Sequence, residues 1–414
     1  RLARNDQEIA SWAHPFEALA AVATGDPENV RFDGECPEGM DFVGGWVGVL
    51  GYDLARQIER LPEHAQHDPV LPRQWWLAVD QVLAFHHASG LWWHATVHGP
   101  SERWPWTQPD RPEIWTRTLQ RARGSLPART HWHAGPRSLR TSRAQFERGV
   151  RAIREAIARG DVLQVNLTRR EDADFAGDAW ALYEDLVSAN PAPFAAYLEG
   201  PGFAIASCSP ERFLHRRGDG VEARPMKGTV ARGVDEAGDN AQRQWLAASA
   251  KDHAENVMIV DLMRNDLGRV AEVGSVRVPE LFALEPYATV WQMVSTVQAR
   301  LPAGCGVDDL LRACWPPGSV IGAPKVKAME IIESLEPLRR GWYAGSVGYL
   351  DCRGNMDLSV VIRTAIVAGG RVMLQFGGGI VADSDPAKEW AETVAKGRYL
   401  VETLERGAGK ARLG

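Results

Sequence analysis

A lysine and a glutamate sixteen residues apart are the side chains of this chain best suited to covalent or acid-base chemistry. Lys227 lies in the run P-M-K-G-T and Glu211 in the run S-P-E-R-F. Gly218 and Gly220 predict a turn between them, so we expect the two segments to pair as an antiparallel hairpin. A lysine attacks a substrate only when its surroundings hold it neutral. An exposed ion pair explains the same spacing, and the residues alone leave both interpretations open.

Two pairs of carboxylates share helix faces. Asp252 and Glu255 lie three residues apart in one helical stretch, and Glu389 and Glu392 repeat this spacing in another. Carboxylates from two helices can hold a hard cation such as Mg²⁺, which prefers one or two carboxylates together with substrate oxygens and water. Two solvated helix faces are the simpler alternative.

Two further features are suited to binding an anion. The run Gly377-Gly378-Gly379 ends a strand and lets backbone N–H groups approach a carboxylate, although a tight turn needs the same residues. Arg363 interrupts an apolar strand with a fork of donors, which suits either a carboxylate ligand or a buried structural ion pair. The stretch from Gly318 to Lys325 lacks the order of a phosphate loop, so it does not predict nucleotide binding.

The elements that position these residues can be read from periodicity. A capping box at Ser142 and Gln145 predicts a helix that ends at Gly160. The alternation over residues 161–170 predicts a strand, with Gln164 and Asn166 on one face. Further helices are expected over 241–262, 326–335 and 386–405, and strands over 275–279, 288–297, 344–350, 356–367 and 371–376. This order predicts an α+β fold with a mainly antiparallel sheet.

Composition excludes several classes of protein. The chain has 414 residues, 45% of them apolar, and a net charge of −6, which does not favour nucleic-acid binding. Its five cysteines have no C-x-x-C spacing, so we predict neither a disulfide framework nor a zinc site, and we expect a reducing cytoplasm. No apolar run reaches the roughly 18 residues of a membrane span. The first residue is not Met, and we expect an incomplete N-terminus.

A shift in composition predicts two regions. Residues 1–140 are expected to form a sheet-rich N-terminal subdomain followed by a connector, which holds one helix over 113–124. Residues 141–414 are expected to form the catalytic region.

Several motifs in one order carry a resemblance to a family. S-P-E-R-F, P-M-K-G-T, E-N-V-M-I-V-D-L-M-R-N-D, G-A-P-K, G-Y-L with I-R-T, and G-G-G-I-V-A-D-S follow one another within residues 40–405. In this the chain resembles the chorismate-utilising enzymes. The resemblance implies two intertwined halves with mainly antiparallel sheets, which form a β-sandwich-like core flanked by helices. It also implies that chorismate and Mg²⁺ bind in a cleft between the halves.

The resemblance also implies roles for single residues. Glu255 and Glu392 are expected to bind Mg²⁺, with Asp252 and Glu389 as nearby carboxylates, and Glu211 is expected to assist departure of the C4 hydroxyl of chorismate. Residues expected to bind the carboxylates of the substrate are Gly228, Thr229, Tyr349, Arg363, Gly377, Gly378, Gly379 and Lys396.

Two positions distinguish branches of the family. Relatives that make anthranilate, isochorismate or salicylate resemble one another in having a small residue where this chain has Lys227. That amine marks the branch that aminates C4, where it is proposed to attack C2 of chorismate. Relatives that activate water have a lysine base where this chain has Gln164, which is expected to contact the substrate. Both positions favour amination at C4 by ammonia, with 4-amino-4-deoxychorismate as the product.

The resemblance leaves alternatives and implies partners. An anthranilate synthase component I and a non-catalytic chorismate-fold subunit are the alternatives. Relatives often have Thr where this chain has Ile321, and anthranilate enzymes have His where it has Gln292.

No G-x-C-x-G nucleophile motif surrounds any cysteine, so ammonia is expected from a separate glutamine amidotransferase subunit. A separate downstream lyase is expected to form 4-aminobenzoate, the folate precursor.

Overall fold

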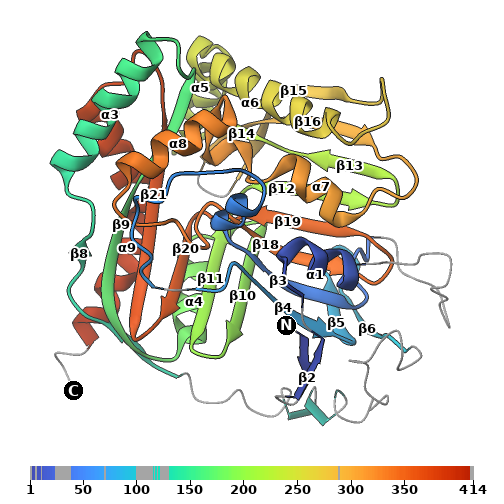
Figure 1. The fold of residues 1–414 in the computed structure, drawn as a ribbon. Helices are drawn as coiled ribbons and strands as arrows, with labels where there is room; N and C mark the ends of the chain where they lie inside the picture. The colour runs from blue at the N-terminus through green and yellow to red at the C-terminus, as the bar shows by residue number, and fades with distance from the viewer. Residues whose placement is uncertain are drawn as a thin grey trace.

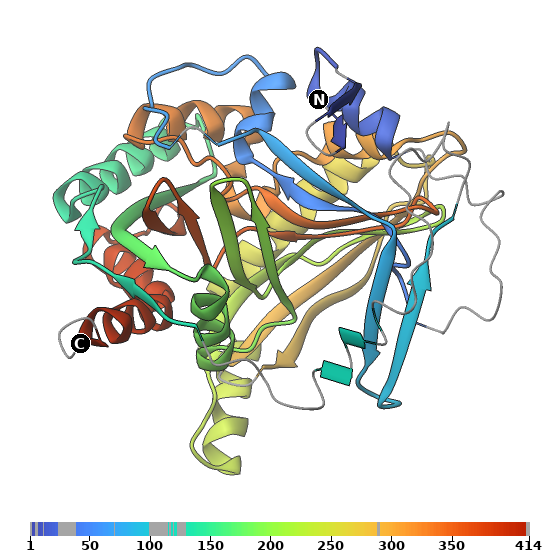
Figure 2. The same ribbon diagram turned by 90° about the horizontal axis from the view of Figure 1, so that it is seen from below.

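The fold consists of two large antiparallel sheets that pack against each other, with helices on their outer sides (Figures 1 and 2). In this computed structural model the described residues are 2–4, 7–10, 12–23, 39–69, 71–98, 115, 117–118, 120–121, 130–287 and 290–410. The helix expected over 113–124 falls largely outside them.

The first sheet contains eight strands within the described residues. In spatial order its strands are β10 (Phe194–Gly200), β11 (Phe203–Ser209), β20 (Thr364–Ala368), β21 (Arg371–Ile380), β9 (Gln164–Gly177) and β17 (Gly322–Ala323), with β7 (Trp132–Ala134) and β8 (Ser138–Leu139) also paired to β9.

The second sheet contains nine described strands. In spatial order these are β14 (Met226–Ala231), β16 (Val290–Arg300), β13 (Gly220–Ala223), β12 (Arg212–Arg217), β19 (Met356–Val360), β18 (Ser346–Asp351), β3 (Gly45–Leu50) and β4 (Gln74–Val79), with β15 (Arg277–Pro286) paired to β16. Two small hairpins join β1 (Leu2–Arg4) to β2 (Gln7–Ala10) and β5 (Gln81–His86) to β6 (Leu91–Thr96).

Helices flank both sheets: α9 packs on β21, α3 on β9, and α6 on β14 and β16. The helices are α1 (Pro15–Val22), α3 (Arg143–Ala158), α4 (Ala179–Ala189), α5 (Glu236–Ala247), α6 (Ala250–Gly268), α7 (Val307–Cys314), α8 (Lys325–Leu335) and α9 (Pro386–Lys410), with 3-10 helices η1 (Tyr52–Gln57) and η2 (Gly318–Val320).

Apolar side chains from both sheets meet in a common core layer. Val49 and Val347 of the second sheet pack in one cluster with Ile205, Ile366 and Met373 of the first. Burial of such side chains supplies the main favourable free energy for holding two sheets together. The predicted α+β fold with a mainly antiparallel, sandwich-like core is therefore confirmed.

The predicted helix after Ser142 is confirmed, including its capping box. The strand that follows, β9, is longer than predicted and runs through Arg169, Arg170, Glu171 and Asp172, all of them buried. Residues two apart in a strand share a face, so Arg169 pairs with Glu171 and Arg170 with Asp172. These pairs allow a run of charged residues to stay in the sheet interior.

Two predicted elements are divided in the structure. The helix expected over 241–262 is two helices, α5 and α6, because the Ser249 hydroxyl accepts the N–H of Asp252 and caps a new helix. The strand expected over 356–367 is β19 and β20, separated at Arg363, which has a left-handed φ of 54°. That conformation cannot continue a strand.

The predicted pairing of the Glu211 and Lys227 segments is wrong. The hairpin at Gly218 joins β12 to β13, whereas β14, which carries Lys227, pairs with β16. Two strands therefore lie between β14 and β12 in the sheet.

Strands β3 and β4 extend the second sheet next to β18, so the N-terminal segment joins strands from the C-terminal half. The boundary expected near residue 140 stays a prediction. None of the described helices is long and apolar enough to cross a membrane.

Candidate active site

Lys227 and Glu211 meet at Ser319 of η2. The Lys227 Nζ donates to the backbone carbonyl of Ser319 at 3.2 Å. The Ser319 hydroxyl and the Met226 N–H donate to the Glu211 carboxyl group, which is 6% exposed. A small cavity borders Glu211 and Ser319. The structure thus brings the predicted amine and acid together, although their strands do not pair.

Burial shifts the two groups in opposite directions. It raises the pKa of Glu211 to about 7, although the hydrogen bond from Ser319 and the charge of Lys227 lower it. Burial also lowers the pKa of Lys227, and the nearby Lys396 ammonium lowers it further, against the carboxylates Glu255, Glu211 and Glu392. Each shift favours the uncharged form of its group, which is the neutral amine of Lys227 and the protonated carboxyl of Glu211.

The predicted metal-binding carboxylates surround a lysine. Burial alone would lower the pKa of Lys251, but the charges of Glu255, Glu389 and Glu392 outweigh burial, so the pKa is raised. Glu255 lies 3.6 Å from the Lys251 ammonium, and Glu392 lies 2.6 Å from that of Lys396. Carboxylates from α6 and α9 therefore face one region that favours positive charge.

The donor set of this region fits Mg²⁺ as a partly hydrated ion. No three His, Cys, Asp or Glu side chains in the described ranges gather closely enough to form a closed metal site. Mg²⁺ does not need such a cage, since it is commonly held by one or two carboxylates plus substrate oxygens and water. Glu255 and Glu392 could supply those two carboxylates.

Glu389 and Asp252 have other contacts in the structure. Burial raises the pKa of Glu389, which accepts a hydrogen bond from the Ser384 hydroxyl at 2.6 Å. Asp252 lies against Gly228: a methyl group at that glycine would approach the Asp252 Cβ to 3.0 Å. Gly228 also has a φ of 92°. A side chain there is therefore disfavoured both by the contact with Asp252 and by the backbone conformation. The neighbouring Thr229 hydroxyl donates to Gln292 Oε1 at 2.6 Å.

The three glycines of β21 lie at an edge that β20 no longer covers, since β20 pairs only as far as Leu374. Opposite Gly377 and Gly379, the N–H groups of Thr168 and Asn166 donate away from β21, to Glu336 and Ile321. Both are therefore non-hydrogen-bonded pairs, and the N–H groups of Gly377 and Gly379 face the open edge.

Gly378 faces helix α9 instead. A methyl group at this position would lie 3.5 Å from Glu389 and 3.7 Å from Glu392 and Lys396. The Lys396 ammonium also donates to the Gly377 carbonyl at 3.1 Å. The glycine strand and the acidic face of α9 are thus parts of one site.

Arg363 sits immediately before β20. Its carbonyl accepts the Tyr399 hydroxyl at 3.2 Å and the Cys208 N–H at 3.1 Å, which fixes the backbone in its left-handed conformation. Across the described residues its guanidinium has no carboxylate partner. A free guanidinium here is suited to a substrate carboxylate.

Tyr343 and Tyr399 both lie near Arg363, and the role expected for Tyr349 stays a prediction. The Tyr349 ring packs on Phe42, with 4.8 Å between ring centroids, and its pKa is raised by burial and by the charges of Asp357 and Asp41. Tyr343 instead is buried, and Arg363 is among the charges that act on it. Tyr343 lies in the turn before β18 and Tyr349 within β18, and the sequence did not distinguish the two.

Gln164 lies beneath Gly379, on the face of β21 opposite α9. Its side chain is 1% exposed, and neither its amide oxygen nor its amide nitrogen has a hydrogen-bond partner. Asn166 Oδ1, which lies near Gly377, is also unpaired. Buried amides without partners are rare, and they are suited to a ligand with polar groups.

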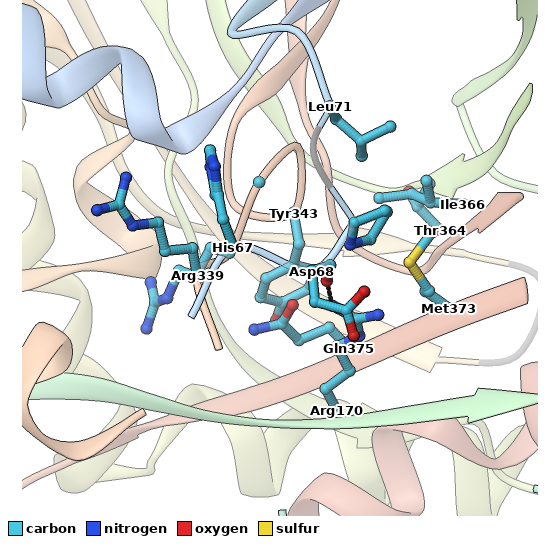
Figure 3. Close-up of a pocket in the computed structure, with 13 residues that line it drawn as sticks. His67, Asp68, Leu71, Arg170, Arg339, Tyr343, Thr364, Ile366, Met373 and Gln375 are labelled. Carbon is cyan, nitrogen blue, oxygen red and sulfur yellow. Dashed lines mark hydrogen bonds between the residues drawn. The ribbon is translucent and has the colours of Figure 1, made fainter. Parts of the chain in front are cut away.

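A separate small cavity beside the first sheet is lined by Tyr343, Arg170, Asp68 and Gln375 among others (Figure 3). None of the predicted site residues lines it. The dashed line in Figure 3 joins Arg170 to the Asp68 carbonyl. The ion pairs of Arg170 and Asp68 make this cavity part of the structural framework.

Sequence reasoning missed Ser319 and Tyr343. Ser319 was visible only inside a loop that lacks a phosphate-binding pattern, and no spacing rule points to it.

Comparison with known proteins shows the family of the chain. The chain belongs to the chorismate-binding enzymes, because the model of that family matches residues 2–402. It is 45% identical over 367 residues to aminodeoxychorismate synthase component 1 of Klebsiella aerogenes, covering 88% of this chain and 78% of that protein. The corresponding protein of Escherichia coli is 44% identical over 376 residues, covering 89% and 79%.

Other relatives have different names. Anthranilate synthase component 1 of Thermus thermophilus is 40% identical over 375 residues, which cover 89% of this chain and 79% of that protein. Among solved structures, anthranilate synthase component I of Streptococcus pneumoniae superimposes with a TM-score of 0.81 at 27% identity, covering 95% of this chain and 87% of that one.

Proposed function

We propose that this chain is component I of an aminodeoxychorismate synthase, which replaces the C4 hydroxyl of chorismate by ammonia. The observation that carries the proposal is the contact of Lys227 and Glu211 with one residue, Ser319, in surroundings that favour a neutral amine and a protonated acid. Similarity to aminodeoxychorismate synthase component 1 of two bacteria supports it.

The proposed first step uses both residues. The Lys227 amine attacks C2 of the ring, and the double bonds move from C1=C2 and C5=C6 to C1=C6 and C4=C5. The C4–O bond breaks, and Glu211 donates the proton with which the hydroxyl leaves as water. A carboxyl group with a pKa of about 7 retains a proton to donate near neutral pH.

Ammonia completes the reaction in the proposed second step. It attacks C4, the double bonds return to C1=C2 and C5=C6, and the C2–N bond to Lys227 breaks. The new C4 ammonium gives a proton to the Glu211 carboxylate, which restores the acid. The balance is chorismate plus ammonia to 4-amino-4-deoxychorismate plus water.

The remaining residues bind and orient the substrate in this proposal. Arg363 and the N–H groups of Gly377 and Gly379 receive one substrate carboxylate, with Tyr343 beside them. Gly228 and Thr229 receive the ring carboxylate. Mg²⁺, held by Glu255 and Glu392, would supply positive charge to a substrate carboxylate.

The partners are also part of the proposal. The relatives named component 1 support a second component, and we propose that it is a glutamine amidotransferase subunit that supplies ammonia. We further propose that the protein works in the cytoplasm and that a separate lyase converts the product into 4-aminobenzoate for folate synthesis.

Product identification tests the proposal. The chain is incubated with chorismate, Mg²⁺ and ammonium, and the products are analysed by liquid chromatography and mass spectrometry. The expected product yields 4-aminobenzoate only after an aminodeoxychorismate lyase is added. Absence of turnover would favour a non-catalytic subunit.

Anthranilate synthase component I is the second candidate, because the Thermus thermophilus protein of that name is 40% identical. Its reaction eliminates pyruvate, so direct appearance of anthranilate in the same experiment would replace the first candidate by this one.

A further inference from the structure

Lys325, the first residue of α8, directs all three donors of its ammonium group to atoms of the protein. Nζ donates to Asp266 Oδ2 at 2.6 Å, to the Cys314 carbonyl at 2.8 Å and to the Pro316 carbonyl at 3.0 Å. The Lys325 side chain is 12% exposed and that of Asp266 4%. An ammonium group has three donors and no acceptor, so this one is fully used.

The three acceptors come from different parts of the fold. Asp266 lies in α6, the helix that also carries Glu255, while Cys314 ends α7. Pro316 is the second residue of the connection from α7 to α8, and every residue from 313 to 323 is buried. Lys325 directly follows the connection and binds Pro316 near its start. It therefore links both ends of the connection to α6 and α7.

Ser319 lies in the middle of the connection. Its carbonyl accepts from Lys227 and its hydroxyl donates to Glu211. A movement of the connection would change both contacts at once. Within η2 itself, no side chain caps the helix, so the short turn depends on outside contacts for its position.

We infer that Lys325 is a positioning residue, which holds the connection through Ser319 against Lys227 and Glu211 without touching the substrate. The inference rests on the proposed function of those two residues. A compact ammonium suits three acceptors around one point, whereas the planar fork of arginine does not.

The test compares Lys325→Met with Lys327→Met as a matched control, because Lys327 is exposed on the same helix and its ammonium lies 3.0 Å from the Glu330 carboxylate. Lys325→Met should lower kcat about 100-fold, as expected when catalytic groups are misplaced by about 1 Å. The KM for chorismate should change little, since no substrate contact is removed. Lys327→Met should behave as the wild type.

The dependence of kcat on pH separates positioning from general destabilisation. Ser319 donates to the Glu211 carboxylate and favours its ionised form, so loss of this bond should move the alkaline limb of the profile to higher pH. The limb should move in the same direction in Lys325→Met and in Ser319→Ala, with rates expressed per concentration of free NH₃. An unmoved limb in Lys325→Met would overturn the inference.

A charge-balanced variant covers the case in which Lys325→Met does not fold. Lys325→Met/Asp266→Asn removes both buried charges, which should restore the free energy of unfolding but leave kcat low. If kcat recovers together with stability, the role of Lys325 is only structural and the inference fails. If the wild type makes no 4-amino-4-deoxychorismate, the proposed function fails first, and the inference falls with it.

Discussion

Glu211 and Lys227 contact the same serine, although two other strands separate β12, which follows Glu211, from β14, which contains Lys227. Glu211 lies just before β12, and Lys227 lies near the start of β14, where the register with β16 is irregular. That irregularity frees the Lys227 side chain from the regular ladder, and η2 brings Ser319 to both residues. The pair is therefore assembled by tertiary contacts.

Lys227→Ala should lower turnover at saturating ammonia by about 100-fold or more, because a covalent nucleophile is lost. The wild type is incubated with chorismate in the absence of ammonia, and the reaction is then quenched. Intact-protein mass spectrometry should show an added mass equal to chorismate minus water. The variant should show none. Lys388→Ala, at an exposed position of α9, is the control. Unchanged turnover in Lys227→Ala would mean that the amine positions charge and does not attack carbon.

Much of the fold could be predicted from local pattern. The helix after Ser142 and the closing helix after Pro386 were predicted because caps and apolar periodicity are local signals. The division between α5 and α6 was missed because an apolar pattern continued across Ser249. The pairing of the Glu211 and Lys227 segments was mispredicted for a different reason. The strand that pairs with β14 comes from residues 290–300, and no local pattern connects these residues with β14.

The candidate site could be predicted only through motifs. The carboxylates of α6 and α9 were located by their spacing, because residues three apart share a helix face. Ser319 and Lys325 could not be found this way, since their contacts depend on where a buried connection runs. The effect of Arg363 on Tyr343 likewise depends on how the turn before β18 packs.

Glu211→Gln should change how stability depends on pH. The folded-state pKa of Glu211, about 7, is above the ordinary value of 4.5. A raised pKa of this kind adds stability that is fully present below pH 4.5 and is lost as pH rises through 7. The wild type should therefore lose on the order of 3 kcal/mol relative to Glu211→Gln between pH 4.5 and 8.

Urea denaturation at several pH values measures this difference, and Glu402→Gln, at an exposed position of α9, is the control that should show none. Glu211→Gln should also be inactive, because an amide cannot donate the required proton. A pH-independent difference in stability would mean that the Glu211 carboxyl is not perturbed.

Gly379→Ala should destabilise the protein and abolish turnover. The new methyl group would lie 1.9 Å from Gln164 Nε2, and Gln164 is too deeply buried to move aside easily. Overpacking of this kind costs about 1–3 kcal/mol. In the double variant Gly379→Ala/Gln164→Ala the clash is gone, so most of the stability should return. Thermal denaturation of the four proteins gives the coupling free energy.

Gly268→Ala is the matched control, because nothing lies within 4 Å of a methyl group at that helical position. It should be neutral or slightly stabilising. Turnover should stay low in the double variant if Gln164 contacts substrate; full recovery would contradict that role.

Glu255→Gln and Lys251→Met should change Mg²⁺ binding in opposite directions. Glu255 is a proposed ligand, so its loss should raise the Mg²⁺ concentration needed for half-maximal turnover about tenfold or more. Lys251 places a competing positive charge beside Glu255, and its removal should lower that concentration. Turnover is measured against Mg²⁺ after treatment with EDTA, and calorimetry without substrate measures binding directly. Glu402→Gln should leave both curves unchanged. Equal effects of Glu255→Gln and Glu402→Gln would place the cation elsewhere, because only Glu255 faces the region where Glu389 and Glu392 favour positive charge.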